Sequence, residues 1–376
     1  MRKPLLGLLG ATALAAASVA TPASAQDITI AAVGPMTGQY AAFGTQLKRG
    51  AEMAVADINA KGGVLGRKIK LEIGDDACDP KQARAVAEKL AAQKVSFVAG
   101  HFCSSSSIPA SEVYSEAGIL QITPASTNPR LTDEAAQKKW INVFRTCGRD
   151  DQQGAVAGQW LAKAYKGKKV AIVHDKSTYG QGLADETQKA MNKAGLKEAM
   201  YEAVTQGDKD FTALISKMKA ANVDAIYYGG YHTEAGLIVR QSREQGYRAV
   251  FVSGDALVDN EYWKITGPAG QGTVMTFAPD PRKAPTAKDI VAKFKAQNYD
   301  PEGYTLYTYA ALQVWAAAVA KTNSLDVKKL SPAIRGQKFN TVIGDLQYDG
   351  KGDVSNSKYV FYIWDNGEYH ETNVGS

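Results

Sequence analysis

The chain alternates between short apolar segments and amphipathic segments, and this alternation occurs in two separate series. The first series opens after Asp27 with ITIAAVG, and further apolar runs begin near Lys68, Val95 and Gly118. Between these runs, apolar residues recur at the spacing of an α-helix. Strands that alternate with helices are typical of a parallel sheet covered by helices on both faces. We therefore expect an α/β fold.

The second series begins after about Arg149. Its predicted strands are KKVAIVHD, DAIYYGG and AVFVSGD, each separated from the next by a helical segment. Two more helices are expected near residues 290–296 and 304–320, and KYVFYIWD is expected to form a last strand buried on both faces. A chain of 376 residues is long for a single hydrophobic core, so the two series predict two Rossmann-like lobes.

The first 25 residues have the pattern of a secretory signal peptide. Arg2 and Lys3 precede an apolar run from Leu5 to Ala20, and Ala23-Ser24-Ala25 resembles a cleavage site. A membrane anchor is the alternative, but the run is shorter than the roughly 20 residues that a span needs. We expect export to the periplasm and a soluble mature chain that begins at Gln26 or Asp27.

The charge pattern argues against nucleic acid as a partner. Removing Arg2 and Lys3 from 44 basic residues leaves 42 against 38 acidic ones, a net charge of +4. The basic residues are scattered, without a block that could follow a phosphate backbone. A monomer is the expected state.

Polar turns follow two consecutive strands of the first series. GHFCSSSS follows the strand near Val95, with Pro109 expected in the first turn of the next helix, and Ala125-Ser126-Thr127 follows the strand near Gly118. The hydroxyls and free N–H groups of these turns would lie at one sheet edge beside a helix N-terminus, which favours a small anion such as a carboxylate. The alternative is that the serines form only a linker or a helix cap.

The strands of the second series are followed by aromatic and acidic residues. Tyr179, Tyr231 and Asp255 each come shortly after one of these strands. Ligands of open α/β sheets bind outside the carboxyl ends of the strands. Hydrogen-bond donors for an anion on one lobe and a carboxylate on the other suit a zwitterion. The alternative is that these residues are ordinary members of surface loops, which also contain tyrosine and aspartate.

Cys78, Cys103 and Cys147 are the three cysteines. Cys78 and Cys103 each lie just past a predicted strand, and if those strands are adjacent their ends are close. In an oxidising compartment we expect a Cys78–Cys103 disulfide that contributes about 3 kcal/mol. Three free buried thiols are the alternative.

No catalytic or metal-binding motif is present in the sequence. The four histidines show no HExxH or other ligand spacing, and there is no GxSxG elbow, P-loop or GxGxxG. Ser104 and His174 could belong to a triad only by an arrangement that the sequence does not indicate. We expect a protein that is not an enzyme and that needs no cofactor or metal.

Several segments resemble the leucine/isoleucine/valine-binding proteins, which are periplasmic type I solute-binding proteins of branched-chain amino-acid ABC importers. The segments are DDACDPKQA, GHFCSSS, ITPAST, IVHDKSTYGQG, YYGGYH and TYAALQ. The resemblance implies two lobes with three crossings, one formed by residues 27–149 plus 279–358 and the other by 150–278 plus 359–376. It also implies delivery of an amino acid to membrane permease subunits. An amino-acid sensor coupled to a membrane receptor would share this fold.

The resemblance assigns roles to individual residues. Ser104 and Thr127 would hold the α-carboxylate of the ligand, with Ser126 in the same turn, while the carbonyl of Ala125 would accept from the ammonium group. Tyr231 and Asp255 would meet the ammonium from the other lobe. The remaining expected pocket residues are Phe43, Phe102, Cys103 (through its backbone), Tyr179 and Tyr304.

Three positions depart from the branched-chain pattern. Asp255 stands in place of Glu, Phe102 in place of Leu, and Tyr304 in place of Phe. Bulkier walls narrow an aliphatic pocket. Overpacking costs about 1–3 kcal/mol, which is enough to reorder the affinities for different aliphatic amino acids. The hypothesis is a preference for alanine, valine, proline or γ-aminobutyrate, with leucine weakened.

Overall fold

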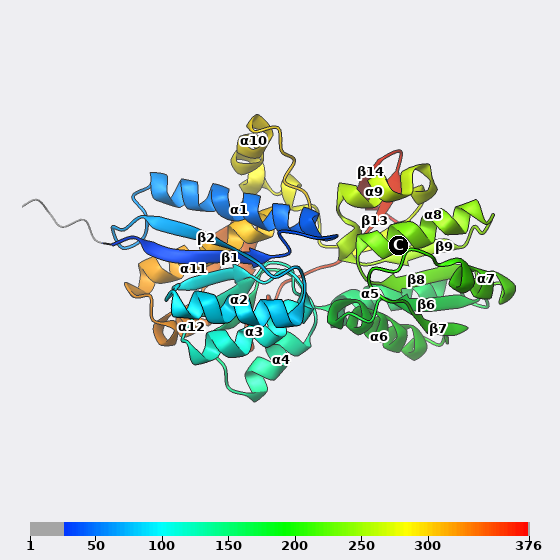
Figure 1. Ribbon diagram of the computed structural model, residues 1–376, viewed down its shortest axis with the longest axis horizontal. Helices are drawn as coiled ribbons and strands as arrows, with labels where there is room; N and C mark the ends of the chain where they lie inside the picture. The colour runs from blue at the N-terminus through cyan, green and yellow to red at the C-terminus, as the bar shows by residue number, and fades with distance from the viewer. Residues whose placement is uncertain (1–25, 375–376) are drawn as a thin grey trace, which may run out of the picture.

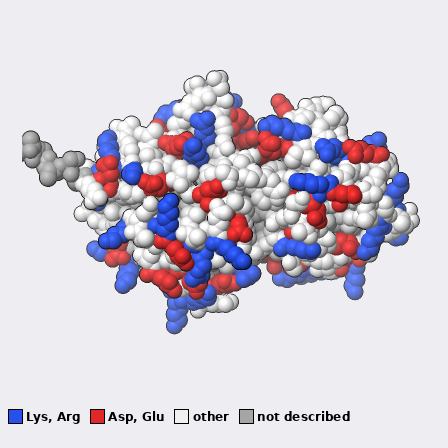
Figure 2. All heavy atoms as spheres, in the orientation of Figure 1, with Lys and Arg blue, Asp and Glu red and all other residues white. Residues whose placement is uncertain are grey.

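The computed structural model describes residues 26–374, which form two α/β bodies side by side along the long axis of the molecule (Figure 1). The signal-peptide prediction lies outside the described residues. On the face shown in Figure 2, basic and acidic side chains are interspersed over both bodies. Within the described part, no helix is long and apolar enough to cross a membrane.

The first body is built on five parallel strands in the order β2-β1-β3-β4-β5. These strands are β1 (Ile28–Gly34), β2 (Ile69–Asp75), β3 (Phe97–Gly100), β4 (Leu120–Thr123) and β5 (Val143–Arg145). The helices around them are α1 (Ala41–Ala60), α2 (Pro80–Ala92), α3 (Ser104–Glu116), α4 (Arg130–Gln137), α10 (Lys288–Ala296), α11 (Thr305–Thr322) and α12 (Val327–Arg335). A small hairpin joins them, β11 (Lys338–Thr341) with β12 (Gly344–Gln347).

Side chains alternate between the two faces of this sheet, as the pleat of a strand requires. Ile30 and Ala32 of β1 share a core with α1, α11 and α12, whereas Ala31 and Val33 share another with α2 and α3. The parallel sheet is therefore buried on both faces, as the sequence predicts.

The second body is built on seven strands in the order β14-β13-β10-β9-β8-β6-β7. The five parallel strands are β6 (Val170–His174), β7 (Met200–Ala203), β8 (Ala225–Gly229), β9 (Val250–Ser253) and β10 (Val274–Phe277). Two antiparallel strands extend this sheet, β13 (Val360–Asp365) and β14 (Glu368–Thr372). Its helices are α5 (Asp150–Ala164), α6 (Thr178–Lys193), α7 (Thr212–Ala220), α8 (His232–Glu244) and α9 (Asn260–Thr266).

The disulfide between Cys78 and Cys103 is present, but the reason given for it was wrong. Strand β1 lies between β2 and β3, so the two strands that precede the cysteines are not neighbours. The loop after β2 reaches across the end of β1 instead, with Ala77 and Cys78 in the left-handed region at φ of 48° and 58°.

Two other predictions need correction. Helix α3 begins at Ser104, so the four serines form its first turn and Pro109 lies inside the helix rather than in that turn. Strand β13 is only partly buried: Phe361, Tyr362 and Trp364 are buried, whereas Val360, Ile363 and Asp365 are half-buried. The segments β5, β7, β10, β11, β12, β14, α4, α5, α9 and α12 were not predicted, and most of them except α5 are too short to show a clear period.

Candidate functional site

The two bodies meet at the carboxyl ends of their strands, around a small enclosed cavity. Its lining residues come from both bodies: Phe102, Ser104, Ala125 and Tyr304 on one side, and Tyr179, Tyr231, Asp255 and Ala256 on the other. The space among them is close to the size of a water molecule. A larger molecule can enter only when the bodies separate or the side chains turn.

Both halves of the cavity lie where the strand order of a sheet reverses. Strand β1 has β2 and β3 on its two sides, and Phe102 and Ser104 follow β3. In the second sheet β6 lies between β7 and β8, and Tyr179 and Tyr231 follow β6 and β8. Such reversals open a crevice outside the strand ends, which is where open α/β sheets bind ligands.

One end of the cavity carries unpaired hydrogen-bond donors. The N–H of Ser104 lies in the first turn of the 13-residue helix α3, where no intrahelical acceptor exists. Beside the cavity, the Thr127 N–H has no acceptor among the described residues, while the buried Thr127 hydroxyl is directed to Asp150, whose pKa it lowers. The positive end of the helix dipole and these donors favour an anion.

The other end carries the carboxylate of Asp255, which follows β9. Its Oδ1 atom accepts hydrogen bonds of 2.9 Å from Gln153 Nε2 and from the Tyr179 hydroxyl, and its Oδ2 atom accepts from the Tyr304 hydroxyl. Burial raises the pKa of Asp255, while the donors from Tyr304, Gln153 and Tyr179 lower it. Burial also holds the pKa of both tyrosines well above the usual range, so they remain protonated donors.

Close packing before Asp255 favours a glycine. A Cβ atom on Gly254 would lie 2.5 Å from Leu183 Cδ2 and 2.6 Å from Gln153 Nε2. Real side chains do not approach so closely, so the glycine lets helices α5 and α6 deliver their polar groups to the carboxylate.

Aromatic rings form the walls. Phe43 stacks on Phe102 at 4.6 Å between ring centroids, and Phe102 meets Tyr304 edge-on at 5.3 Å. Tyr179 and Tyr231 are 5.0 Å apart in the other body. Rings packed in this way exclude water and leave the cavity little freedom to change its shape.

Not all of the predicted site residues line the cavity. Phe43 lies behind Phe102, and the side chain of Cys103 is held in the disulfide. The Ser126 hydroxyl donates to the Phe102 carbonyl oxygen at 2.9 Å and meets the Ser107 hydroxyl at 2.6 Å, so it fixes the turn. Thr127 is fully buried in the same turn and is not among the lining residues.

Sequence reasoning missed two residues of α5. Gln153 reaches Asp255, and Asp150 is a fully buried carboxylate without a hydrogen bond of standard geometry on either oxygen. Burial raises the pKa of Asp150, and the nearby charge of Asp255 raises it further. Their i, i+3 spacing at the start of a helix was the available signal, but many surface helices show it too.

Hydrogen bonds between the bodies surround the cavity. Glu234 accepts from Gln39 Nε2 at 3.2 Å, and Gln206 Nε2 donates to the Tyr40 hydroxyl at 2.8 Å. Farther along, Gln46 Nε2 donates to Asp259 Oδ2 at 2.7 Å. These contacts hold the two bodies together. Among residues 26–374, no group of three or more His, Cys, Asp or Glu side chains is placed to hold a metal ion.

Comparisons with known proteins find relatives over nearly the whole chain. A profile described as "Periplasmic binding protein" matches residues 27–368. A "Leu/Ile/Val-binding protein homolog 1" of Brucella melitensis is 49% identical over 98% of this chain and 97% of its own. An "Amino acid binding protein" of Pseudomonas aeruginosa is 50% identical over 96% and 97%.

Solved structures show the same arrangement. A leucine-binding protein of Thermotoga maritima superposes with a TM-score of 0.84 at 29% identity, over 92% of this chain and 97% of its own. A branched-chain amino-acid transporter substrate-binding protein of Streptococcus pneumoniae, in complex with isoleucine, gives 0.82 at 25% identity, over 92% and 99%.

Proposed function

The chain belongs to the periplasmic binding protein family, and we propose that it captures an amino acid in the cavity between its lobes and delivers it to the permease of an ABC importer. Its relatives are named for amino-acid binding, and one structural neighbour holds isoleucine. The observation that carries the proposal is a buried cavity with hydrogen-bond donors for an anion at one end and a carboxylate at the other. The work of such a protein is capture, with no chemical turnover.

The two ends of a zwitterion have separate partners in this proposal. The ligand's carboxylate accepts from the N–H groups of Ser104 and Thr127 and from their hydroxyls, at the N-terminus of α3. Its ammonium group donates to Asp255 and to the Ala125 carbonyl, with Tyr231 against its other side. A carboxylate offers about four acceptor positions, and the donors from Gln153, Tyr179 and Tyr304 leave about one for the ammonium.

The moving bodies proposed here are residues 27–149 plus 279–358 and residues 150–278 plus 359–376, the last two residues lying outside the described part. The five-stranded sheet falls within the first body and the seven-stranded sheet within the second. Contacts that a ligand makes with both bodies favour the closed form, so closure follows from differential affinity.

The preferred ligand proposed here is a small or compact amino acid. Phe102 and Tyr304 are in edge contact at 5.3 Å, and the Tyr304 hydroxyl extends to Asp255 across the space that a longer aliphatic chain would need. Alanine, valine, proline and γ-aminobutyrate need less of this space than leucine does. Filling an already packed site costs about 1–3 kcal/mol, or roughly 5- to 150-fold in affinity.

A calorimetric panel of those four amino acids and leucine tests the proposal, after any bound solute is removed by partial unfolding and dialysis. We expect at least one of the four to bind at least tenfold more tightly than leucine. Tighter binding of leucine than of all four would overturn the substrate assignment. No binding of any amino acid would overturn the function itself.

The periplasm is the proposed location, with cleavage before Gln26 or Asp27 and a monomeric mature chain that binds no nucleic acid. Family membership supports a periplasmic protein. Mass spectrometry of the chain recovered from the periplasm of an expressing bacterium would test the cleavage site. A mature mass that retains Arg2 and Lys3 would contradict it.

A further inference from the structure

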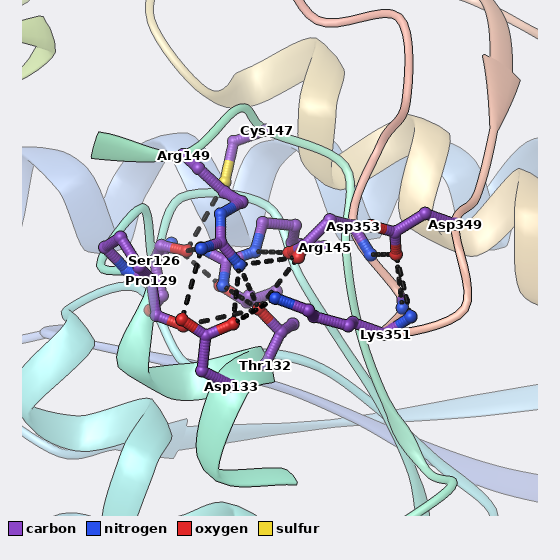
Figure 3. Close-up of polar contacts among 12 residues, drawn as sticks. Ser126, Pro129, Thr132, Asp133, Arg145, Cys147, Arg149, Asp349, Lys351 and Asp353 are labelled. Atoms are coloured by element: carbon purple, nitrogen blue, oxygen red, sulfur yellow. Dashed lines mark hydrogen bonds and ion pairs between the residues drawn. The ribbon is translucent and has the colours of Figure 1, made fainter. Parts of the chain in front are cut away.

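The turn that carries Thr127 is held from behind by an arginine that the proposed function does not use. Arg145 Nη1 donates to the Ser126 carbonyl oxygen at 2.6 Å (Figure 3), and Nη2 donates to the Asn128 carbonyl oxygen at 3.2 Å. The carbonyl between them, that of Thr127, accepts from the Asp150 N–H at 2.9 Å. Three successive carbonyl groups are thus held by groups outside the cavity.

Fixing a carbonyl also fixes the N–H on the other side of the same peptide bond. In a trans peptide the C=O and N–H point in opposite directions. The Ser126 carbonyl points to Arg145, so the Thr127 N–H points away from it, and within the described residues no acceptor receives that N–H. The next N–H, that of Asn128, lies 3.2 Å from Ser104 Oγ, beside the cavity.

Arg145 itself has almost no freedom to move. It is fully buried, its Nη2 donates to Thr132 Oγ1 at 2.9 Å, and its Nε lies 2.7 Å from Asp353 Oδ1. The guanidinium therefore acts as a rigid fork that joins β5, the turn after β4, helix α4 and the segment near Asp353.

The same cluster leaves positive charge behind the turn. Asp353 is shared, because its Oδ2 atom lies 2.8 Å from Arg149 Nη1, so two guanidinium groups divide one buried carboxylate (Figure 3). The other partners of Arg149, Asp133 and Asp151, have side chains that are 34% and 39% exposed, and water weakens their influence. The charge of Arg145 also acts on the buried carboxyl group of Asp150, whose pKa it lowers.

We propose that Arg145 is a positioning residue for the ligand's carboxylate. It holds the Ser126 and Asn128 carbonyls so that the Thr127 N–H meets the carboxylate, and its charge stabilises the anion from behind. This inference rests on the proposed function. Hydrogen bonds to charged groups are stronger than neutral ones, so loss of this support should weaken carboxylate recognition by about 10- to 100-fold, which is about 1.4–2.8 kcal/mol.

The test compares the tightest of the four panel amino acids with its carboxamide, which lacks the anion. The variants are Arg145→Gln and Arg145→Lys, and the matched control is Arg149→Gln, which touches the same Asp353 but no carbonyl of the turn. We expect the preference for the amino acid over its amide to fall about 10- to 100-fold in Arg145→Gln and less in Arg145→Lys. Arg149→Gln leaves the carbonyl groups of the turn held, so it should lower the preference less than either Arg145 variant.

An unchanged preference in folded Arg145 variants would overturn the inference while leaving the proposed function intact. If those variants do not fold, the wild-type protein still decides. Its Thr127 amide, followed by ¹⁵N NMR, should shift downfield and gain protection from hydrogen exchange when the amino acid is added. A Thr127 amide that does not respond, in a protein that binds the amino acid, would also overturn it.

Discussion

Replacing Asp255 by asparagine removes the negative charge from the cavity and keeps the shape of the side chain. In the wild type, the three donors to this carboxylate are Gln153, Tyr179 and Tyr304, two of them at 2.9 Å. An amide keeps one oxygen as an acceptor but brings two N–H donors of its own. One of them must then face the ligand's ammonium group or a tyrosine hydroxyl.

The expected loss of affinity follows from the burial of this group. Asp255 is 3% exposed, so a bound ammonium has no water to replace the lost partner. A hydrogen bond between charged groups contributes about 1.5–3 kcal/mol, which predicts binding weaker by about 10- to 150-fold. Because the buried ammonium group is left without a partner, we expect a loss of affinity near the upper end of this range.

Stability should respond differently from affinity. Burial raises the pKa of Asp255, which means that the folded protein disfavours its ionised form. Removing this charge relieves that cost and weakens three hydrogen bonds, so the two effects oppose each other. We expect the free energy of unfolding at pH 7.5 to change by no more than about 1 kcal/mol, which separates lost binding from lost folding.

Isothermal titration calorimetry of both proteins, with urea unfolding alongside, measures the two quantities. Asp259→Asn is the matched control, because Asp259 is also buried, accepts from Gln46 across the lobes at 2.7 Å, and does not line the cavity. An unchanged dissociation constant in Asp255→Asn would refute the role of the carboxylate. Equal losses in both variants would show that lobe closure, and not the ammonium contact, had been disturbed.

Three further variants test other parts of the site. Tyr304→Phe removes the hydroxyl that reaches Asp255, so the affinity ratio of leucine to alanine should rise about tenfold, and a calorimetric ratio that stays constant would contradict the steric argument. Asp150→Asn should raise stability, because the raised pKa of Asp150 makes the wild type lose stability as pH rises above the ordinary carboxyl value. The gain in melting temperature should grow from pH 5 to pH 8, and a constant gain would disprove the linkage. Cys78→Ser opens the disulfide loop of sequence separation 25 and should lower the free energy of unfolding by about 3 kcal/mol, a loss that urea titration of the reduced wild type should reproduce.

The sequence predicted the fold class because the alternation of strands and helices is a local property. The period of apolar residues showed both series, and the turns after the strands held polar and aromatic residues where a ligand would bind. The cysteine pair was also predicted, although from a strand order that the sheet does not have. Short elements such as β5 were not predicted, since three residues are too few to show a period.

Contacts between distant residues were decided only by the tertiary structure. Tyr304 and Asp255 are 49 positions apart, and Gln153 and Asp255 are 102 apart, yet both pairs meet in the cavity. The same holds for Arg145 and Asp353, whose pairing joins the turn of Thr127 to a segment from near the end of the chain. Local patterns carry no information about such pairs, because packing of whole helices and sheets brings them together. The residue types at the site thus follow from the sequence, while the partners that set their charge and direction follow from the fold.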